Sequence, residues 1–203
     1  MLNTGLPLRQ AVVMANKKKV FLEIGTCDFD TCLPLTEGNW KGYMVEANPK
    51  HAATMTEQAA DSDVKVFNYA ISDYDGDIQL LTSESESGDD WARGLSHISS
   101  DNHLGERLLE TGRNKKYVGE EVTVPCLTLD SFLDEAGIKN LDYLQIDTEG
   151  HEVNILKDYS WKVKPSFIKV EHFHVDDILL AGMLEAEGYY VWVERNDIYG
   201  ILK

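Results

Sequence analysis

The sequence has few cysteines, little positive charge and no long apolar run. Its three cysteines form neither an even set nor a Cys-x-x-Cys pair, so we expect reduced thiols in the cytoplasm rather than disulfides or a zinc site. Its 19 basic residues stand against 35 acidic ones, a net charge of −16, which argues against a nucleic-acid partner. No stretch approaches the roughly 20 apolar residues of a membrane span, so no membrane partner is expected.

The length of 203 residues fits one domain with one sizeable core. The sequence shows no internal repeat and no interdomain linker, so we predict a single domain over residues 1–203. Residues 1–19 have no signal-peptide pattern and are predicted to form a lead-in helix that ends in a basic turn. Residues 83–121 are polar and without periodicity, and we interpret them as an irregular insertion that could serve as a substrate lid.

Apolar runs that end in turn residues alternate with helix-like segments along most of the chain. The predicted strands cover residues 20–25, 42–46, 64–70, 78–82, 122–128 (as an edge strand), 141–146, 166–171, 189–194 and 198–202. The predicted helices cover residues 31–37, 49–60, 129–136, 148–159 and 176–187. The last two strands are joined by three residues and must pair antiparallel. The pattern predicts an α/β fold with a doubly wound, mostly parallel, seven-stranded sheet and a C-terminal antiparallel hairpin.

The stretch from Leu141 to Glu152 carries the strongest sign of a functional site. A mostly apolar run ends abruptly in Asp147-Thr148-Glu149-Gly150-His151-Glu152. In an open α/β sheet, ligands sit where strands end in this way. We expect Glu149 and Glu152 in the first turn of the next helix, where acids complement the helix dipole.

The loop after the first strand indicates which cofactor suits the fold. A dinucleotide-binding loop reads Gly-x-Gly-x-x-Gly, but here the frame reads Gly25-Thr26-Cys27-Asp28-Phe29-Asp30. Two carboxylates would repel a pyrophosphate, which counts against a nucleotide-dependent oxidoreductase. S-adenosylmethionine has no phosphate and carries two cationic groups, which Glu23, Asp28 or Asp30 could attract. The alternative is that Asp28 or Asp30 caps the following helix.

Two further strand ends have residues suited to a nucleoside. Glu46 lies 21 positions after Gly25, close to the roughly 20-residue spacing of an acid that binds ribose hydroxyls. A solvated acid near a helix N-terminus is the alternative. The run Asn68-Tyr69-Ala70-Ile71-Ser72-Asp73 could supply hydrogen bonds to adenine, although its polar residues are also ordinary turn formers.

Three of these segments resemble motifs of FkbM-type methyltransferases, in matching order. Asp147 to Glu152 is similar to the family's Asp-x-Glu-Gly signature, and Glu46-Ala47-Asn48-Pro49 resembles Glu-Pro-Asn-Pro with one proline replaced. Asn68 to Asp73 resembles Asn-x-Ala-(Leu/Ile)-Ser-Asp. The first loop departs from the family's Asp-Val-Gly-Ala-Asn-x-Gly. The resemblance runs discontinuously over about residues 20–175 and so covers most of the chain.

The resemblance implies a Rossmann-like class I methyltransferase fold, S-adenosylmethionine as cofactor, and a hydroxyl oxygen of a small glycan or secondary metabolite as acceptor. The expected cofactor-binding residues are Glu23, Gly25, Thr26, Cys27, Asp28, Glu46, Ala47, Asn68, Ala70, Ile71 and Asp147. A catalytically idle binding or assembly module on the same fold is the alternative, and an oxidoreductase is the less favoured one. The sequence leaves the oligomeric state open.

The expected catalytic residues are Asp147, His151, Glu171 and His172. Methyl transfer to a hydroxyl needs an aligned acceptor and a base or metal. Asp147 is the first candidate, for orienting the acceptor or the cofactor's amino group, and His151 is either a base or a cap. His172 and His174, two apart on a predicted strand, could bind a divalent metal with a carboxylate. Structural or substrate-contacting histidines are favoured, so no metal site is expected.

Overall fold

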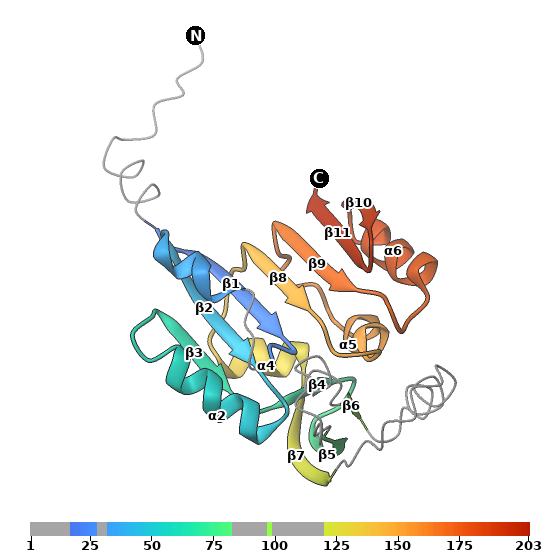
Figure 1. Ribbon diagram of the computed structural model, residues 1–203. Coiled ribbons are helices and arrows are strands. Elements are labelled where there is room, and N and C mark those ends of the chain that lie inside the picture. Colours follow the sequence, from blue (N-terminus) through green and yellow to red (C-terminus); the bar gives the residue numbers. More distant parts are fainter. Residues whose placement is uncertain (1–16, 28–31, 83–96, 99–119) are drawn as a thin grey trace.

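The computed structural model describes residues 17–27, 32–82, 97–98 and 120–203 (Figure 1). Its main sheet has seven strands in the order β10-β11-β9-β8-β1-β2-β3. Their bounds are β1 Lys19–Ile24, β2 Trp40–Val45, β3 Val64–Phe67, β8 Tyr143–Ile146, β9 Phe167–Glu171, β10 Tyr189–Glu194 and β11 Asp197–Leu202. Strand β11 pairs antiparallel with β9 and β10, and the other pairs are parallel. The predicted seven-stranded, mostly parallel sheet with a terminal hairpin is confirmed.

Helices cover both faces of this sheet. Their bounds are α2 Pro49–Gln58, α4 Leu129–Glu135, α5 Glu152–Lys157, α6 Asp177–Ala186 and the 3-10 helix η1 Leu33–Glu37. On one face, Met55 of α2 packs with Phe21 and Met44. On the other, the apolar sides of α4, α5 and α6 form one core cluster with the sheet. Because β1 and β8 are covered on both faces, they read as nearly continuous apolar runs.

A second, four-stranded sheet lies beside the carboxyl ends of β1 and β2 (Figure 1). Its strands are β4 Ala70–Ser72, β5 Gly76–Leu81, β6 His97–Ile98 and β7 Glu121–Thr128, in the order β4-β7-β5-β6. The predicted strand 64–70 is confirmed only as far as Phe67, where β3 ends, because Ala70 begins β4 in the other sheet. The predicted strand 122–128 is confirmed as β7, but its predicted edge position is wrong, because β7 lies between β4 and β5. Its alternating pattern reflects a sheet with one buried face.

Two predicted helices differ from the structure. Helix α5 begins at Glu152 rather than at residue 148, because Glu149 and Gly150 have positive φ angles of 55° and 110°. The predicted helix 31–37 is a 3-10 helix that begins at Leu33. Helices α2 and α6 are confirmed, with the side chains of Asn48 and Asp176 capping their N-termini.

Parts of two predicted segments lie outside the described residues. They are residues 1–16 of the lead-in helix, and residues 83–96 and 99–119 of the insertion. The ends of these segments are described: Lys19 already belongs to β1, and Glu121 begins β7. In the ranges that the structure covers, no helix has the length and apolar character needed to cross a membrane.

Candidate active site

The loops that follow β1, β2 and β8 meet at one edge of the main sheet. Strand β1 lies between β2 and β8, and the chain winds in opposite directions from this point. The Gly25 N–H donates to the Val45 carbonyl at 2.9 Å, and the Asp147 N–H donates to the Ile24 carbonyl at 3.0 Å. Ligands of open α/β sheets bind where the winding reverses, outside the carboxyl ends of the strands.

Gly25 allows the closest approach between these loops. Its φ angle is +82°, and a Cβ atom at this position would lie 1.6 Å from the Asp147 carbonyl oxygen. The sequence predicted a glycine loop that a cofactor approaches. The structure adds a second reason for the glycine, because the loop after β1 packs directly on the backbone of the candidate catalytic residue Asp147.

Glu46 connects the loops after β1 and β2. Its Oε2 accepts a hydrogen bond from the Cys27 N–H at 2.6 Å, and its Oε1 accepts one from the Asn48 N–H at 2.7 Å. Glu46 is only 6% exposed, so the fold fixes the orientation of its carboxylate. Cys27 has a φ angle of 54°, which is the glycine-like conformation that this loop position requires. Asp28 lies outside the described residues.

Three other predicted cofactor residues, Asn68, Ala70 and Ile71, lie beside the loop after β2 or in the strand β4. The Asn68 side-chain amide donates to the carbonyls of Glu46 and Ala47, at 2.8 and 2.9 Å. Ala70 and Ile71 are buried in β4. Asn68 therefore holds the loop after β2, a role that its sequence context did not reveal.

Thr26 is a polar residue at this edge that has no described partner for its side chain. It is 4% exposed, and its Oγ1 has no hydrogen-bond partner among the described residues. Burial of a hydroxyl without a partner is unfavourable, so this Oγ1 is well suited to bind a ligand.

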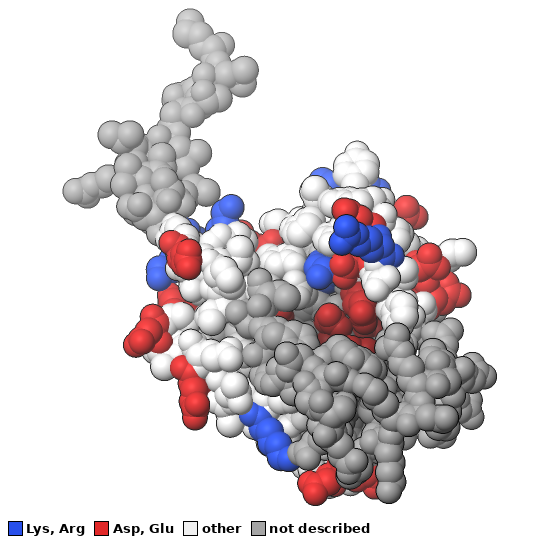
Figure 2. All heavy atoms as spheres, viewed as in Figure 1, with Lys and Arg blue, Asp and Glu red and all other residues white. Residues whose placement is uncertain are grey.

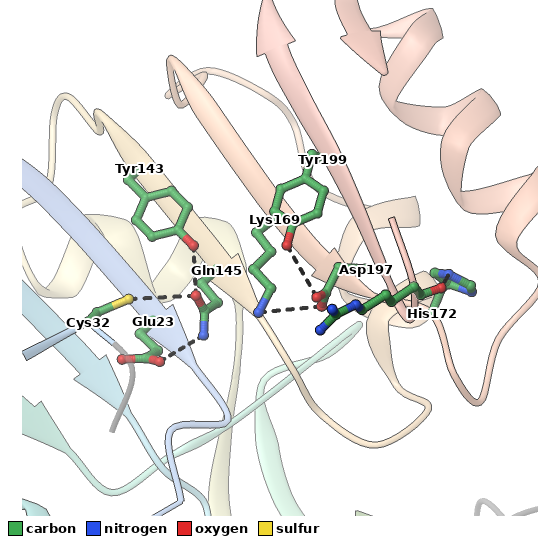
Figure 3. Close-up of polar contacts among 9 residues, drawn as sticks. Glu23, Cys32, Tyr143, Gln145, Lys169, His172, Asp197 and Tyr199 are labelled. Carbon is green, nitrogen blue, oxygen red and sulfur yellow. Dashed lines mark hydrogen bonds and ion pairs between the residues drawn. The ribbon is translucent and has the colours of Figure 1, made fainter. Parts of the chain in front are cut away.

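Glu23 lies in a buried polar network rather than at the rim of the site. Its Oε1 accepts a hydrogen bond from the Gln145 amide at 2.9 Å, and Gln145 in turn accepts one from the Tyr143 hydroxyl at 2.6 Å. Figure 3 shows these side chains projecting from neighbouring strands β1 and β8. Glu23 was predicted to attract the cationic cofactor, and one of its carboxylate oxygens contacts Gln145 of the neighbouring strand β8.

Three carboxylates come together where β8 and β9 end. Asp147, Glu149 and Glu171 each offer an oxygen atom, and these atoms lie within 4.8 Å of one another. Figure 2 shows acidic side chains gathered in this region of the surface. Burial, reinforced by the neighbouring carboxylates, raises the pKa of Asp147 to about 7 and that of Glu171 to about 9. The crowding of these carboxyl groups therefore favours the protonated forms of Asp147 and Glu171.

A short loop directs Glu149 into this cluster. Glu152 accepts hydrogen bonds from the backbone N–H groups of Thr148 and Gly150, at 2.8 and 3.1 Å. The loop therefore turns back on itself, and Glu149 adopts its positive φ angle. We predicted Glu149 in the first helical turn, but it lies outside the helix, with its carboxylate 3.1 Å from His174 Nε2.

His151 and His172 contact other parts of the fold. His151 is 5% exposed, and its Nε2 lies 2.7 Å from the Ser72 hydroxyl, which connects the second sheet to the start of α5. His172 Nε2 lies 3.1 Å from the Arg195 carbonyl. The sequence had suggested that His172 and His174 share one face of a strand. This prediction is wrong, because β9 ends at Glu171.

Sequence reasoning missed Lys169 as a neighbour of the cluster. Its ammonium group lowers the pKa of Asp147, against the larger opposing effect of burial, and lies 3.4 Å from Asp197 Oδ1. Figure 3 shows Lys169 reaching from β9 toward Asp197 of β11. Only the pairing of β9 with β11 brings these residues together, so no local pattern could have identified them.

Comparison with known proteins identifies the family. The family model described as the methyltransferase FkbM domain matches residues 13–190. No curated protein matches the chain. A precorrin-6y C5,15-methyltransferase from Geobacter metallireducens is 13% identical, with a TM-score of 0.48 over 95% of this chain and 85% of that one.

Two other solved structures are similar at the level of the fold. A SAM-dependent methyltransferase from Aquifex aeolicus is 11% identical, with a TM-score of 0.45 over 96% of this chain and 89% of that one. A Bacillus cereus O-methyltransferase in complex with SAH is 14% identical, with a TM-score of 0.43 over 100% and 84%. The seven-stranded sheet with its antiparallel hairpin, together with the family match, identifies the Rossmann-like class I methyltransferase fold. Because the family model spans most of its length, this chain belongs to the FkbM family of S-adenosylmethionine-dependent methyltransferases.

Proposed function

We propose that the protein transfers a methyl group to a hydroxyl oxygen of a small glycan or secondary metabolite. The observation that carries this proposal is the carboxylate cluster of Asp147, Glu149 and Glu171 beside the Gly25 loop. Carboxylates accept hydrogen bonds from hydroxyl groups and favour loss of the hydroxyl proton. A hydroxyl held there would lie next to the edge of the sheet where this fold binds its ligands.

The residues at the edge of β1 and β2 fit S-adenosylmethionine. Glu46 has a fixed carboxylate that can accept hydrogen bonds from ribose hydroxyls, and the Thr26 Oγ1 is buried without a partner in the described residues. The acidic first loop suits a ligand without phosphate. When bound, S-adenosylmethionine supplies a methyl group activated by a sulfonium.

The cluster of Asp147, Glu149 and Glu171 has two tasks in this proposal. Asp147 orients the acceptor hydroxyl, because its backbone is fixed against Gly25 and its carboxylate lies at the end of β8. Glu149 and Glu171 surround the same point. The Glu149 carboxylate would accept the hydroxyl proton as the methyl group passes from sulfur to the acceptor oxygen, and Glu171, whose raised pKa favours its protonated form, would hydrogen-bond there. His151 is a positioning residue, because its contact with Ser72 holds the loop that carries Glu149.

The acceptor atom can be identified with a donor that carries a 13C-labelled methyl group. We would incubate the protein with labelled S-adenosylmethionine and a panel of hydroxyl-bearing glycans and metabolites, and record the product by NMR. The proposal predicts a labelled methoxy group. A label found on carbon or nitrogen instead would show that the acceptor class is wrong.

The Glu46→Ala variant is expected to bind S-adenosylmethionine about 10- to 100-fold more weakly, because bonds from hydroxyls to a charged group contribute roughly 1.5–3 kcal/mol. Isothermal titration calorimetry measures the change. Glu57→Ala, which removes an exposed acid from α2, is the matched control and should bind normally. Equal affinity in the two variants would place the ribose elsewhere.

A further inference from the structure

The geometry of the Asp147, Glu149 and Glu171 cluster suits a cation as well as a hydroxyl. The three oxygen atoms lie within 4.8 Å of one another. Oxygen ligands of Mg²⁺, Mn²⁺ or Ca²⁺ lie about 3 to 5 Å apart when metal–oxygen distances are about 2.1–2.5 Å. The spacing therefore allows all three carboxylates to contact one divalent ion.

Two further observations on Glu171 and on His174 beside it bear on a ligand at this position. Glu171 Oε2 is buried and has no hydrogen-bond partner among the described residues. The His174 side chain is only 10% exposed, and its Nε2 enters the cluster 3.1 Å from Glu149 Oε2. A buried carboxylate oxygen without a partner is unfavourable unless something binds it. His174 holds Glu149 toward the same point, as outer residues commonly do for a metal ligand.

The carboxylate cluster has no ion pair with a basic side chain in the part of the chain that the structure describes: no lysine or arginine there pairs with Asp147, Glu149 or Glu171. Lys169 is the nearest cation that affects Asp147, but its ammonium group pairs with Asp197. The cluster thus brings three oxygen ligands together without a lysine or arginine partner among the described residues.

We propose that Asp147, Glu149 and Glu171 bind one divalent cation of the Mg²⁺ or Mn²⁺ class, with His174 as a positioning residue. Carboxylate oxygens are the preferred ligands of these ions, which retain several water molecules. Such an ion would exchange one of these water molecules for an oxygen of the acceptor. The ion would make an acceptor hydroxyl more acidic and hold it in place. This role rests on the proposed methyl transfer, whereas cation binding does not.

Cation binding can be measured without any acceptor. The full-length protein is freed of metal with a chelator and titrated with Mn²⁺, and the signal of free Mn²⁺ is followed by electron paramagnetic resonance. We expect one saturable site per chain, from which Mg²⁺ displaces Mn²⁺. Removal of a direct ligand should weaken binding at least about tenfold, since even outer-shell partners change affinity by roughly 10- to 100-fold.

Two variants and a control separate loss of the site from loss of the fold. Glu171→Gln removes a ligand charge with little change in shape. Glu149→Gly removes a ligand and favours the observed backbone, because glycine adopts a φ angle of 55° readily. Glu185→Gln, on the exposed side of α6, is the control. Normal circular dichroism with weakened Mn²⁺ binding in both ligand variants, but not in the control, supports the site.

The outcomes distinguish this inference from the proposed function. No Mn²⁺ binding by the native protein, or equal binding by the three variants, would overturn the cation site even if methyl transfer to oxygen proceeds in chelator. Mn²⁺ binding that both ligand variants lose would support the site, even if no hydroxyl acceptor is ever methylated.

Discussion

The Gly25→Ala variant is expected to lose both stability and S-adenosylmethionine binding. A non-glycine residue in the left-handed region costs about 1–2 kcal/mol. The added Cβ would also lie 1.6 Å from the Asp147 carbonyl oxygen, so the loops after β1 and β8 must separate. We expect a total loss of about 3 kcal/mol or more in unfolding free energy, of the size seen when a core is overpacked. Chemical denaturation measures this loss, and calorimetry measures cofactor binding.

Gly182→Ala is the matched control for this prediction. Gly182 lies in helix α6, and a Cβ there would meet no atom within 4 Å. Alanine is favoured over glycine in a helix by about 1 kcal/mol, so this variant should be as stable as the native protein or more so. A Gly25→Ala variant that matched the Gly182→Ala variant in stability and binding would show that the loops do not meet as described.

The Asp147→Asn variant is expected to lose about 100-fold in turnover, because an acceptor that is no longer held in the reactive position reacts about that much more slowly. Its fold should remain stable, because asparagine keeps the shape and removes one of three crowded negative charges. Its backbone contacts with Ile24 and Gly25 are also unchanged. Steady-state kinetics with the acceptor identified by methyl labelling, together with thermal melting, would measure both effects.

Asp142→Asn tests the opposite end of the same segment. The Asp142 carboxylate accepts a hydrogen bond from the Val20 N–H at 2.8 Å, at the amino ends of β1 and β8. This variant should lower stability by about 1–3 kcal/mol, because a backbone donor loses its charged partner, but turnover per folded molecule should hold. If Asp147→Asn instead melted early and kept its turnover, its role would be structural.

The sequence was a good guide to the main sheet because the relevant signals are local. Apolar runs that end in turn residues mark β1, β2, β8 and β9, and the short connection between β10 and β11 requires them to be antiparallel. The break between β3 and β4 was not predictable in this way. The apolar pattern continues through Ile71, and the chain changes sheets where the Asn68 amide binds the carbonyls of Glu46 and Ala47.

The candidate site was only partly predictable, because some of its contacts join segments that are distant in the sequence. Gly25, Glu46 and Asp147 could be identified because each lies at the end of a recognisable strand. Glu149 was misplaced, because its position depends on hydrogen bonds from the loop to Glu152. Glu23 was expected near the cofactor, but the pairing of β1 with β8 sets it beside Gln145. Such contacts depend on strand register, which a single sequence does not specify.

The most direct test of the central claim is a calorimetric titration of the native protein with S-adenosylmethionine and, separately, with NAD. The acidic loop after β1 and the carboxylate of Glu46 predict saturable binding of one S-adenosylmethionine per chain and no binding of NAD. Saturable NAD binding, or no heat from S-adenosylmethionine at any concentration tested, would contradict the account of this edge of the sheet.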